Sequence, residues 1–318
     1  AKQSATPNSE QPFFVLNFAG LNRWLKDVDA VTAEINRPDL ATAVRGLLAL
    51  TGNIQGIDHE KPFGLMAFVN PGEIPEPVAV IFLPVTSIEK TLETLKQIST
   101  ARLSPVAKSQ NRYTLQFGSQ SFHVLFQNGY AFIARKPVSL KRRLPNPAVK
   151  FSQQTRQYDL TIQLNLVEVP SGMKTMIFDY LRAANSEKLD RRHHEPPADH
   201  RLRRLIANSI LALLSRIARD GKRLTFGWNL AEKNRQAMFN INLDALPNTR
   251  LSRAFKRVSS GKSLFSRNDV GRHPLDLRMS WMCGKDEKKI LSSAIQIMGQ
   301  QIQQSSMVSL KQKTQTAQ

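Results

Sequence analysis

Residues 61–98 read KPFGLMAFVN, PGEIPE, PVAVIFLPV and TSIEKTLETLKQI in succession, and this stretch decides the fold. The first and third pieces are short apolar runs rich in Val, Phe and Ile, which favour β-strands. The second piece holds Pro and Gly, which mark a turn. The fourth has apolar residues at helical spacing. The sequence therefore predicts a strand, a turn, a second strand and a helix.

A similar unit recurs at residues 223–258, where RLTFGWNL, RQAMFNINL and LSRAFKRV follow one another. A shift of 163 positions places Phe63 on Phe226 and Gly64 on Gly227. Self-similarity at a fixed period is typical of a duplicated supersecondary unit. We therefore expect an α+β fold of two similar modules, each an antiparallel sheet with helices packed on one face.

The rest of the chain is organised around these two units. Asn128-Gly129 lies between apolar runs and predicts a β-hairpin. Residues 158–166 alternate apolar and polar side chains, as a strand with one solvated face does. The expected divisions are, in order, a disordered lead (1–12), a first αβ module (13–140), a basic Pro-rich linker (141–157), a second αβ module (158–303) with a charged His-rich insertion (185–200), and a disordered tail (304–318). Within the second module, residues 274–282 predict a strand and residues 286–303 a helix.

The chain is strongly basic, with 45 Lys and Arg residues against 25 Asp and Glu residues and a net charge of +20. Residues 1–150 carry 17 basic and 11 acidic residues, whereas residues 151–318 carry 28 and 14. A field of this sign attracts nucleic acid, anionic lipid head groups or acidic polysaccharide. A protein whose basic side chains are merely solvated would have the same composition.

Two basic clusters lie in the second half. Residues 182–223 hold eleven Lys and Arg residues, and residues 250–272 hold seven. No aromatic residues interleave with them as in single-strand nucleic-acid platforms, so diffuse electrostatic binding is favoured over base reading. The candidate polyanion-binding residues are Arg201, Arg203, Arg204, Arg216, Arg219, Arg250, Arg253, Lys256, Arg257 and Lys262. The helix at 200–221 also has an apolar stripe that we expect to face the core, formed by Leu202, Ile206, Ile210, Leu213 and Ile217.

No catalytic, metal or cofactor motif is evident. Gly261-Lys262-Ser263 ends like a phosphate-binding loop, but Lys256 stands where that loop needs its first glycine. The histidines of 185–200 lack zinc-site spacing, and Pro196-Pro197 prevents one helix from holding two of them. Cys283 is the one cysteine, so no internal disulfide can form. We therefore expect no metal and no cofactor.

The first twelve residues, AKQSATPNSEQP, are small and polar and begin with Ala1. This is typical of a mature N-terminus left by signal-peptide cleavage, and equally of an engineered truncation. No apolar run approaches the roughly 20 residues that span a bilayer. The sequence therefore predicts an extracytoplasmic protein without a transmembrane segment.

The stretch DGKRLTFGWNLAEKNRQAMFNINLDALPNTRLSRAF (220–255), with GIDHEKPFG (56–64) and PVAVIFLPV (77–85), resembles a family of uncharacterised exported proteins of planctomycete bacteria. The shared pattern is a strand that reads basic, hydrophobic, any residue, Leu, Gly. This strand leads to a second strand and a turn of small residues. The resemblance covers about residues 13–285. It implies export and an α+β fold, and it carries no catalytic residues.

These observations predict a non-enzymatic binding or structural protein of a bacterial envelope. It would contact an anionic polymer or an acidic protein partner through its basic second half, and it could be a subunit of a larger assembly. One alternative is a hydrolase of an envelope polymer that uses scattered carboxylates such as Asp58 and Glu60. The other is a nucleic-acid-binding protein.

Overall fold

The structure is a computed structural model of the 318-residue chain. It describes residues 11–50, 55–70, 75–97, 101–106, 109–191, 193, 195–231 and 236–259. The chain divides into two compact units, one formed by residues 1–170 and 223–244 and the other by residues 171–222 and 245–318. We call them the sheet unit and the helical unit.

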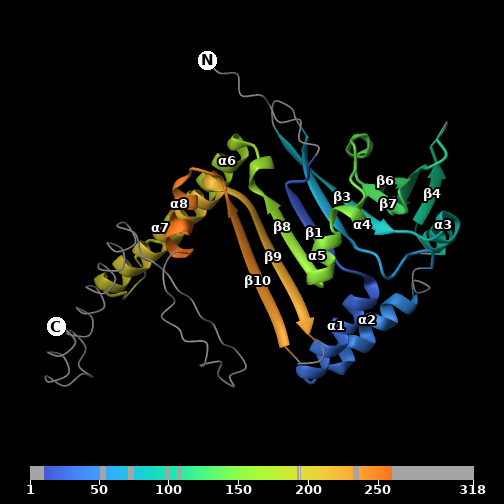
Figure 1. Cartoon of the computed structure of the whole chain (residues 1–318), viewed down its shortest axis with the longest axis horizontal. Coiled ribbons are helices and arrows are strands. Elements are labelled where there is room, and N and C mark those ends of the chain that lie inside the picture. The colour runs from blue at the N-terminus through green and yellow to red at the C-terminus, as the bar shows by residue number, and fades with distance from the viewer. Residues whose placement is uncertain are drawn as a thin grey trace, which may run out of the picture. The chain divides into compact units, whose positions relative to one another are not determined.

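The described strands belong to one antiparallel sheet, shown in Figure 1. Its strand order is β10-β9-β8-β1-β2-β3-β7-β6-β5-β4. The strands are β1 (Phe14–Phe18), β2 (Phe63–Asn70), β3 (Glu76–Pro84), β4 (Ala101–Pro105), β5 (Arg112–Phe117), β6 (Gln120–Gln127), β7 (Tyr130–Ala134), β8 (Leu160–Asn165), β9 (Gly221–Ala231) and β10 (Gln236–Ala245).

The described helices fall into two groups along the chain. The first group is α1 (Leu21–Glu34), α2 (Pro38–Leu50), α3 (Ile88–Gln97), η2 (Pro137–Leu140), α4 (Pro147–Lys150), α5 (Ser152–Gln157) and η3 (Leu166–Glu168). The second group is α6 (Ser171–Lys188), α7 (Pro197–Asp220) and α8 (Arg250–Ser259), which form the described part of the helical unit.

Several local predictions are confirmed. The two strands and the helix expected in residues 61–98 are β2, β3 and α3, and most of the turn between the strands lies outside the described residues. Asn128 and Gly129 have φ angles of 54° and 72°, which suit the tight turn joining β6 and β7. The strand and helix expected at 274–282 and 286–303, and most of the lead and all of the tail, lie outside the described residues.

The α+β class with an antiparallel sheet is confirmed, but the division into two similar modules with separate sheets is wrong. Strand β8 pairs with β1, from Phe14 opposite Leu164 to Phe18 opposite Leu160. This pairing satisfies the backbone groups that two sheet edges would otherwise leave open, and it fuses both halves into one sheet. The order of strand, two helices, two strands and a helix does recur along the chain, as β1–α1–α2–β2–β3–α3 and as β8–α6–α7–β9–β10–α8.

Helices lie on both faces of the sheet, which corrects the expectation of one covered face. Phe18 and its neighbours across the strands, Leu160 and Trp228, mark what we call the Phe18 face. The opposite side is the Val15 face, because side chains alternate along a strand. Trp24 of α1 contacts the Phe18 face, with its ring 6.5 Å from that of Phe18. Segments η2, α4 and α5 cover the Val15 face.

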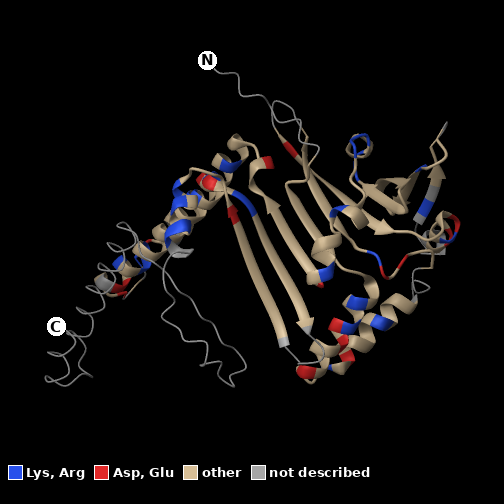
Figure 2. Ribbon diagram, viewed as in Figure 1, with Lys and Arg blue, Asp and Glu red and all other residues tan. Residues whose placement is uncertain are grey.

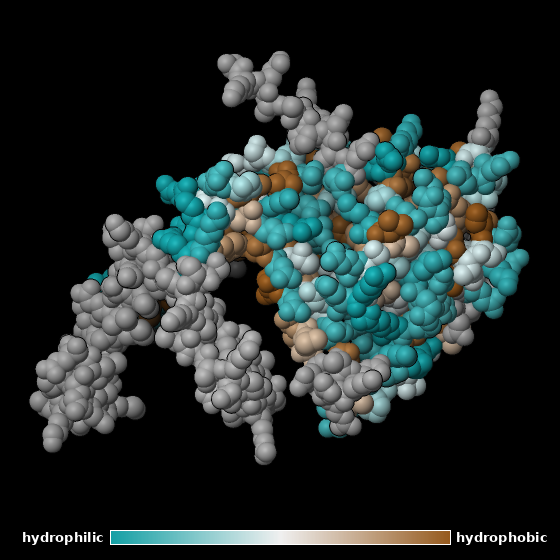
Figure 3. Space-filling model, in the orientation of Figure 1, coloured by the Kyte–Doolittle hydropathy of each residue, from teal (hydrophilic) through white to brown (hydrophobic). Residues whose placement is uncertain are grey.

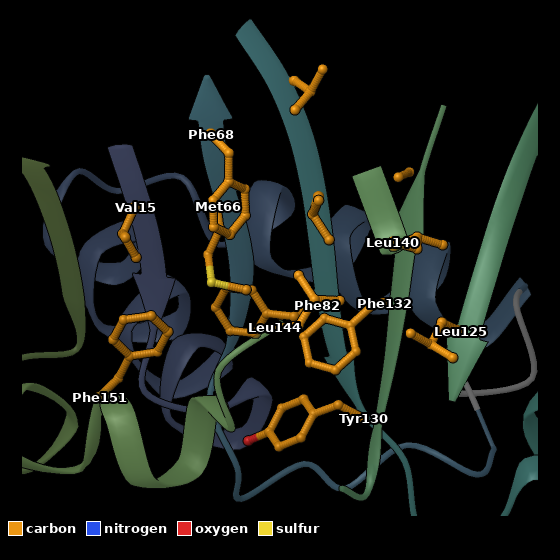
Figure 4. Close-up of a cluster of buried hydrophobic side chains, with 13 residues drawn as sticks. Val15, Met66, Phe68, Phe82, Leu125, Tyr130, Phe132, Leu140, Leu144 and Phe151 are labelled. Atoms are coloured by element: carbon orange, nitrogen blue, oxygen red, sulfur yellow. The ribbon is translucent and has the colours of Figure 1, made fainter. Parts of the chain in front are cut away.

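The main core lies on the Val15 face, as Figure 4 shows. It is built by strand residues such as Met66, Phe82 and Phe132, each 0% exposed. Phe151, between α4 and α5, packs 5.6 Å from the Phe82 ring. Each fully buried aromatic or aliphatic side chain contributes about 1.5–3 kcal/mol by leaving water. Residues 141–157, expected to be a linker, thus supply part of the core cover through Phe151 and Leu144.

Strand β8 alternates apolar and polar side chains as predicted, but the polar side chains are the buried ones. Thr161 and Gln163 on the Val15 face are 1% and 7% exposed, whereas Leu160 and Ile162 on the Phe18 face are only half-buried. The reason is α5, whose Gln154 Nε2 donates to Gln163 Oε1 at 2.6 Å. The Phe18 face is therefore the less covered side of this part of the sheet.

Candidate anion-binding site

Four arginines of the helical unit line one cavity of about 450 Å³, which we call the arginine pocket. It draws residues from all three helices, and Figure 2 shows the Lys and Arg residues gathered along α7 and α8. The lining comprises Phe178, Arg182, Asn208, Leu211, Ala212, Ser215, Arg216, Arg219 and Arg250. Six of these come from one face of α7, because residues three and four apart share a face of a helix.

Local sequence explains where α7 begins and ends. Pro197 occupies the first turn, where its missing N–H costs nothing. Asp199 lies in the first turn and Arg219 in the last, which complements the helix dipole at both ends. Gly221 follows as the C-cap residue. The arginines of the pocket therefore lie toward the end of α7 that favours positive charge.

Helix α8 presents Arg250 through a defined cap. The Ser252 N–H donates to Thr249 Oγ1 at 3.2 Å, and Thr249 Oγ1 donates to the Leu246 carbonyl at 2.8 Å. Leu251 is buried at 4% exposure, whereas its neighbour Arg250 is exposed. The surface over α8 is correspondingly hydrophilic in Figure 3.

Two carboxylates next to the pocket offset part of its charge. Arg182 Nη1 lies 2.9 Å from Asp179 Oδ1, and Arg219 Nε lies 2.9 Å from Asp220 Oδ1. The hydrogen bond from Arg219 holds the pKa of Asp220 below its ordinary value, so this carboxylate is ionised at neutral pH. Two of the four guanidinium groups of the pocket, those of Arg182 and Arg219, are therefore paired with neighbouring carboxylates.

The pocket has the chemistry of an anion site. A guanidinium group presents a planar fork of donors that matches phosphate, sulfate or carboxylate oxygens in pairs. Asn208 and Ser215 add neutral hydrogen-bonding groups, and Phe178 and Leu211 add an apolar wall. The site therefore suits an anionic group carried on a less polar backbone.

The structure brings together three of the predicted residues, Arg216, Arg219 and Arg250. Arg201, Arg203 and Arg204 lie at the other end of α7, roughly 18 Å away at a rise of 1.5 Å per residue. There Arg203 is held by Glu195, with Nη2–Oε2 2.7 Å and Nε–Oε1 2.9 Å. Arg203 therefore ties α7 to the preceding loop.

The remaining predicted residues are on or beyond α8. Arg253, Lys256 and Arg257 are exposed, and Arg253 Nη1 donates to the Asn248 carbonyl at 3.3 Å. Lys262 lies outside the described residues, as do Gly261, Ser263 and Cys283. Arg182 was not predicted. The sequence pointed to Arg182 only through its position at the edge of the basic cluster. Its approach to the α7 arginines depends on how α6 packs, which the sequence pattern does not give.

The apolar stripe of α7 does not face a core in the described part of the chain. Ile206, Ile210 and Leu213 are 50%, 52% and 37% exposed. The stripe has the period that predicts a buried helix face, but α8 spans only the ten residues Arg250–Ser259 and leaves much of the 24-residue α7 uncovered. The expectation that this stripe must lie in the core is wrong for these residues.

The carboxylates considered for hydrolysis lie in one turn before β2. Asp58 Oδ2 is 2.9 Å from Lys61 Nζ, and its Oδ1 accepts from the Glu60 N–H at 3.1 Å. Burial acts to raise the pKa of Asp58, but these hydrogen bonds outweigh it and the pKa is lowered. Glu60 Oε1 accepts from Asn22 Nδ2 at 2.6 Å. Asp58 thus stabilises the turn, and Glu60 links the turn to α1.

Other kinds of site are not found among the residues that the structure describes. No three His, Cys, Asp or Glu side chains of that part cluster as metal ligands would. His200 Nε2 lies 2.7 Å from the Leu189 carbonyl, which links α7 to the end of α6. No described helix combines the length and the apolar character needed to cross a membrane. No family model, curated protein or solved structure matches the chain.

Proposed function

We propose that this protein binds an anionic polymer without chemically transforming it, and that the arginine pocket is the centre of the binding surface. The observation that supports this is the meeting of four arginines from three helices around one cavity. The exposed Arg253, Lys256 and Arg257 on α8 extend the same charge.

The polymer is recognised by its charged groups rather than by its sequence. Arginine forks bind single phosphate, sulfate or carboxylate groups, and a cavity of about 450 Å³ admits one such group with part of its carrier. We also propose, from the resemblance to exported proteins, that the polymer is met outside the cytoplasm. Cell fractionation of the native host tests that location.

Binding to heparin, duplex DNA and anionic vesicles across a salt series tests the proposal. Affinity falls with salt by a power set by the number of ion contacts, about 0.9 per phosphate on duplex DNA. The variant Arg216→Gln/Arg250→Gln removes two pocket charges and flattens this slope by about 1–2.

The matched control is Lys141→Gln/Arg143→Gln, which removes the same charge from two exposed residues of the sheet unit. It leaves the slope unchanged if the pocket is the site. Equal loss in both variants would show that only the net charge of the protein matters. Absence of binding to all three polymers at low salt would refute the proposal.

A further inference from the structure

A second cavity lies in the sheet unit, between α1 and the Phe18 face. Its volume is about 220 Å³, and we call it the aromatic pocket. The three rings in its lining are Phe18 of β1, Trp24 of α1 and Trp228 of β9. The full lining is Phe18, Trp24, Asp27, Val28, Val31, Thr32, Asp159, Leu160 and Trp228.

The sheet fixes the positions of these rings. Phe18 pairs with Leu160 across β1 and β8, and Leu160 pairs with Trp228 across β8 and β9. Directly paired residues point to the same face, so these side chains form one row. Phe63 stacks on Phe18 at 4.9 Å, and Phe239 lies 5.0 Å from Trp228, which supports the row from both sides. The pocket is therefore built on packed rings.

The polar part of the lining is acidic. It holds two carboxylates, Asp27 and Asp159, and no Lys or Arg side chain among the described residues. Asp159 is 5% exposed, forms an ion pair with Arg23, and accepts from the Leu230 N–H at 2.7 Å. A carboxylate offers about four acceptor positions, so these partners do not saturate it. Because Arg23 pairs with Asp159, the attraction for a cation comes chiefly from the ring faces, with Asp27 as the second carboxylate of the lining.

We infer that the aromatic pocket binds a small organic cation with an apolar body, of the methylated-ammonium class. Aromatic faces attract such cations through the ring quadrupole, and Trp does so best. The ring faces complement the positive charge, Asp27 adds a carboxylate to the lining, and the apolar walls accept the methyl groups. An apolar cavity of about 150 Å³ holds a benzene ring, so this larger one admits a group of that size.

The pocket should bind a cation more tightly than a neutral apolar molecule of the same shape. A neutral molecule gains only dispersion and hydrophobic contact with the rings. A cation also gains the attraction of the ring faces and of the Asp27 carboxylate, which a low-dielectric wall strengthens. The pocket should therefore prefer choline over 3,3-dimethyl-1-butanol, its neutral isostere, by about tenfold or more.

Titration with choline and tetramethylammonium, followed by tryptophan fluorescence, tests the inference. The chain has three tryptophans, so a Trp281→Phe background leaves Trp24 and Trp228 as reporters. Trp228→Leu should weaken choline binding by about threefold to thirtyfold. Asp27→Asn should lower the affinity for choline and leave the affinity for the neutral isostere unchanged. This variant can still be tested if Trp228→Leu does not fold.

The control arms decide the outcome. Binding of free choline supports a small-molecule site, and binding only to phosphatidylcholine micelles supports the same chemistry on a lipid head group. Equal affinity for choline and 3,3-dimethyl-1-butanol would overturn the inference, because the pocket would then be merely apolar. So would unchanged choline affinity in folded Asp27→Asn and Trp228→Leu variants. This site shares no residue with the arginine pocket, so either proposal can fail alone.

Discussion

Asn17 and Thr161 face each other across the junction of β1 and β8, and each is 1% exposed. On their outer sides they pair with two glycines, Asn17 with Gly64 of β2 and Thr161 with Gly227 of β9. Asn17 Oδ1 and Thr161 Oγ1 are buried, and the structure gives neither a hydrogen-bond partner. The centre of the sheet therefore has polar side chains with unmet hydrogen-bonding capacity, flanked by residues without side chains.

Thr161→Val is expected to leave stability unchanged or raise the free energy of unfolding by up to about 1 kcal/mol. Valine keeps the shape and removes a buried hydroxyl whose desolvation is not offset by a partner. Thr91→Val is the matched control, since Thr91 is also buried but its Oγ1 donates to the Gly56 and Ser87 carbonyls at 3.0 and 2.7 Å. It should lose about 1 kcal/mol. Urea unfolding measures both; a loss in Thr161→Val would mean that its hydroxyl has a partner.

Gly64→Ala is expected to destabilise the sheet by about 3 kcal/mol or more, a size reserved for severe packing conflict. A Cβ at position 64 would lie 2.0 Å from the Leu16 carbonyl oxygen, a backbone atom that the β1–β2 ladder holds in place. At Gly227 the clash is with the Tyr158 ring, at 2.6 Å, which a side-chain rotation relieves.

Gly227→Ala should accordingly cost less than Gly64→Ala. Gly46→Ala is the control, because Gly46 lies inside α2 and, apart from its chain neighbours and the backbone of its own helix, no atom lies within 4 Å of the place that an alanine methyl group would take. That substitution should stabilise the protein by about 0.5–1 kcal/mol through helix propensity. Chemical denaturation gives the three values, and an order in which Gly227→Ala costs most would contradict this account.

Asp220→Asn should lower stability at neutral pH and raise affinity for anionic polymers. The lowered pKa of Asp220 means that the folded state favours its ionised form through Arg219. That contribution is present above the unfolded pKa of about 3.9 and is lost as pH falls through the folded value. Because Arg219 is 66% exposed, the loss should be only about 1 kcal/mol.

The pH dependence and the binding provide two independent measurements. The stability difference between the wild-type protein and Asp220→Asn should shrink as the pH falls through the lowered folded pKa of Asp220, and vanish once that carboxyl is protonated. Heparin affinity at constant salt should rise, since the pocket loses one of its two neighbouring carboxylates. A difference in stability that does not shrink as the pH is lowered would assign the effect to packing instead of charge.

Local patterns predicted most of the individual strands and helices, because periodicity and turn residues act over a few positions. The joining of β1 to β8 was not predicted, since it pairs backbone edges about 146 positions apart. The sequence also did not predict that residues 141–157 cover the Val15 face, for a related reason. Leu144 and Phe151 stand alone in a basic, Pro-rich stretch, and nothing nearby shows that they cover a core.

In the candidate site, too, only contacts within one helix could be predicted from the sequence. Arg216 and Arg219 are one helical turn apart, so their meeting follows from α7 alone. Arg182 and Arg250 join them only through the packing of α6 and α8, which helix patterns do not specify. Arg203 looked equivalent to these in the sequence, but Glu195 eight residues earlier binds it.

Arg182→Gln is expected to weaken binding with little effect on stability. Arg182 lines the arginine pocket, and its pair with Asp179 is exposed to solvent on both sides. Its loss should therefore weaken heparin binding and reduce the salt slope by about 1, because one ion contact disappears. The free energy of unfolding should change by less than about 0.5 kcal/mol, as is usual for exposed ion pairs. Heparin binding over a salt series and urea unfolding give the two values.

Arg203→Gln is the opposite case and is expected to lower stability while leaving the salt slope nearly unchanged. Arg203 forms two hydrogen bonds to Glu195 and one of 2.9 Å to the Asp190 carbonyl, so it holds the loop before α7 in place. Its loss leaves the Glu195 carboxylate without this partner, and urea should unfold the variant at a lower concentration than the wild-type protein. The same salt series serves for both variants. If Arg203→Gln reduced the slope as much as Arg182→Gln, the binding surface would run along the whole of α7 and would not be centred on the pocket.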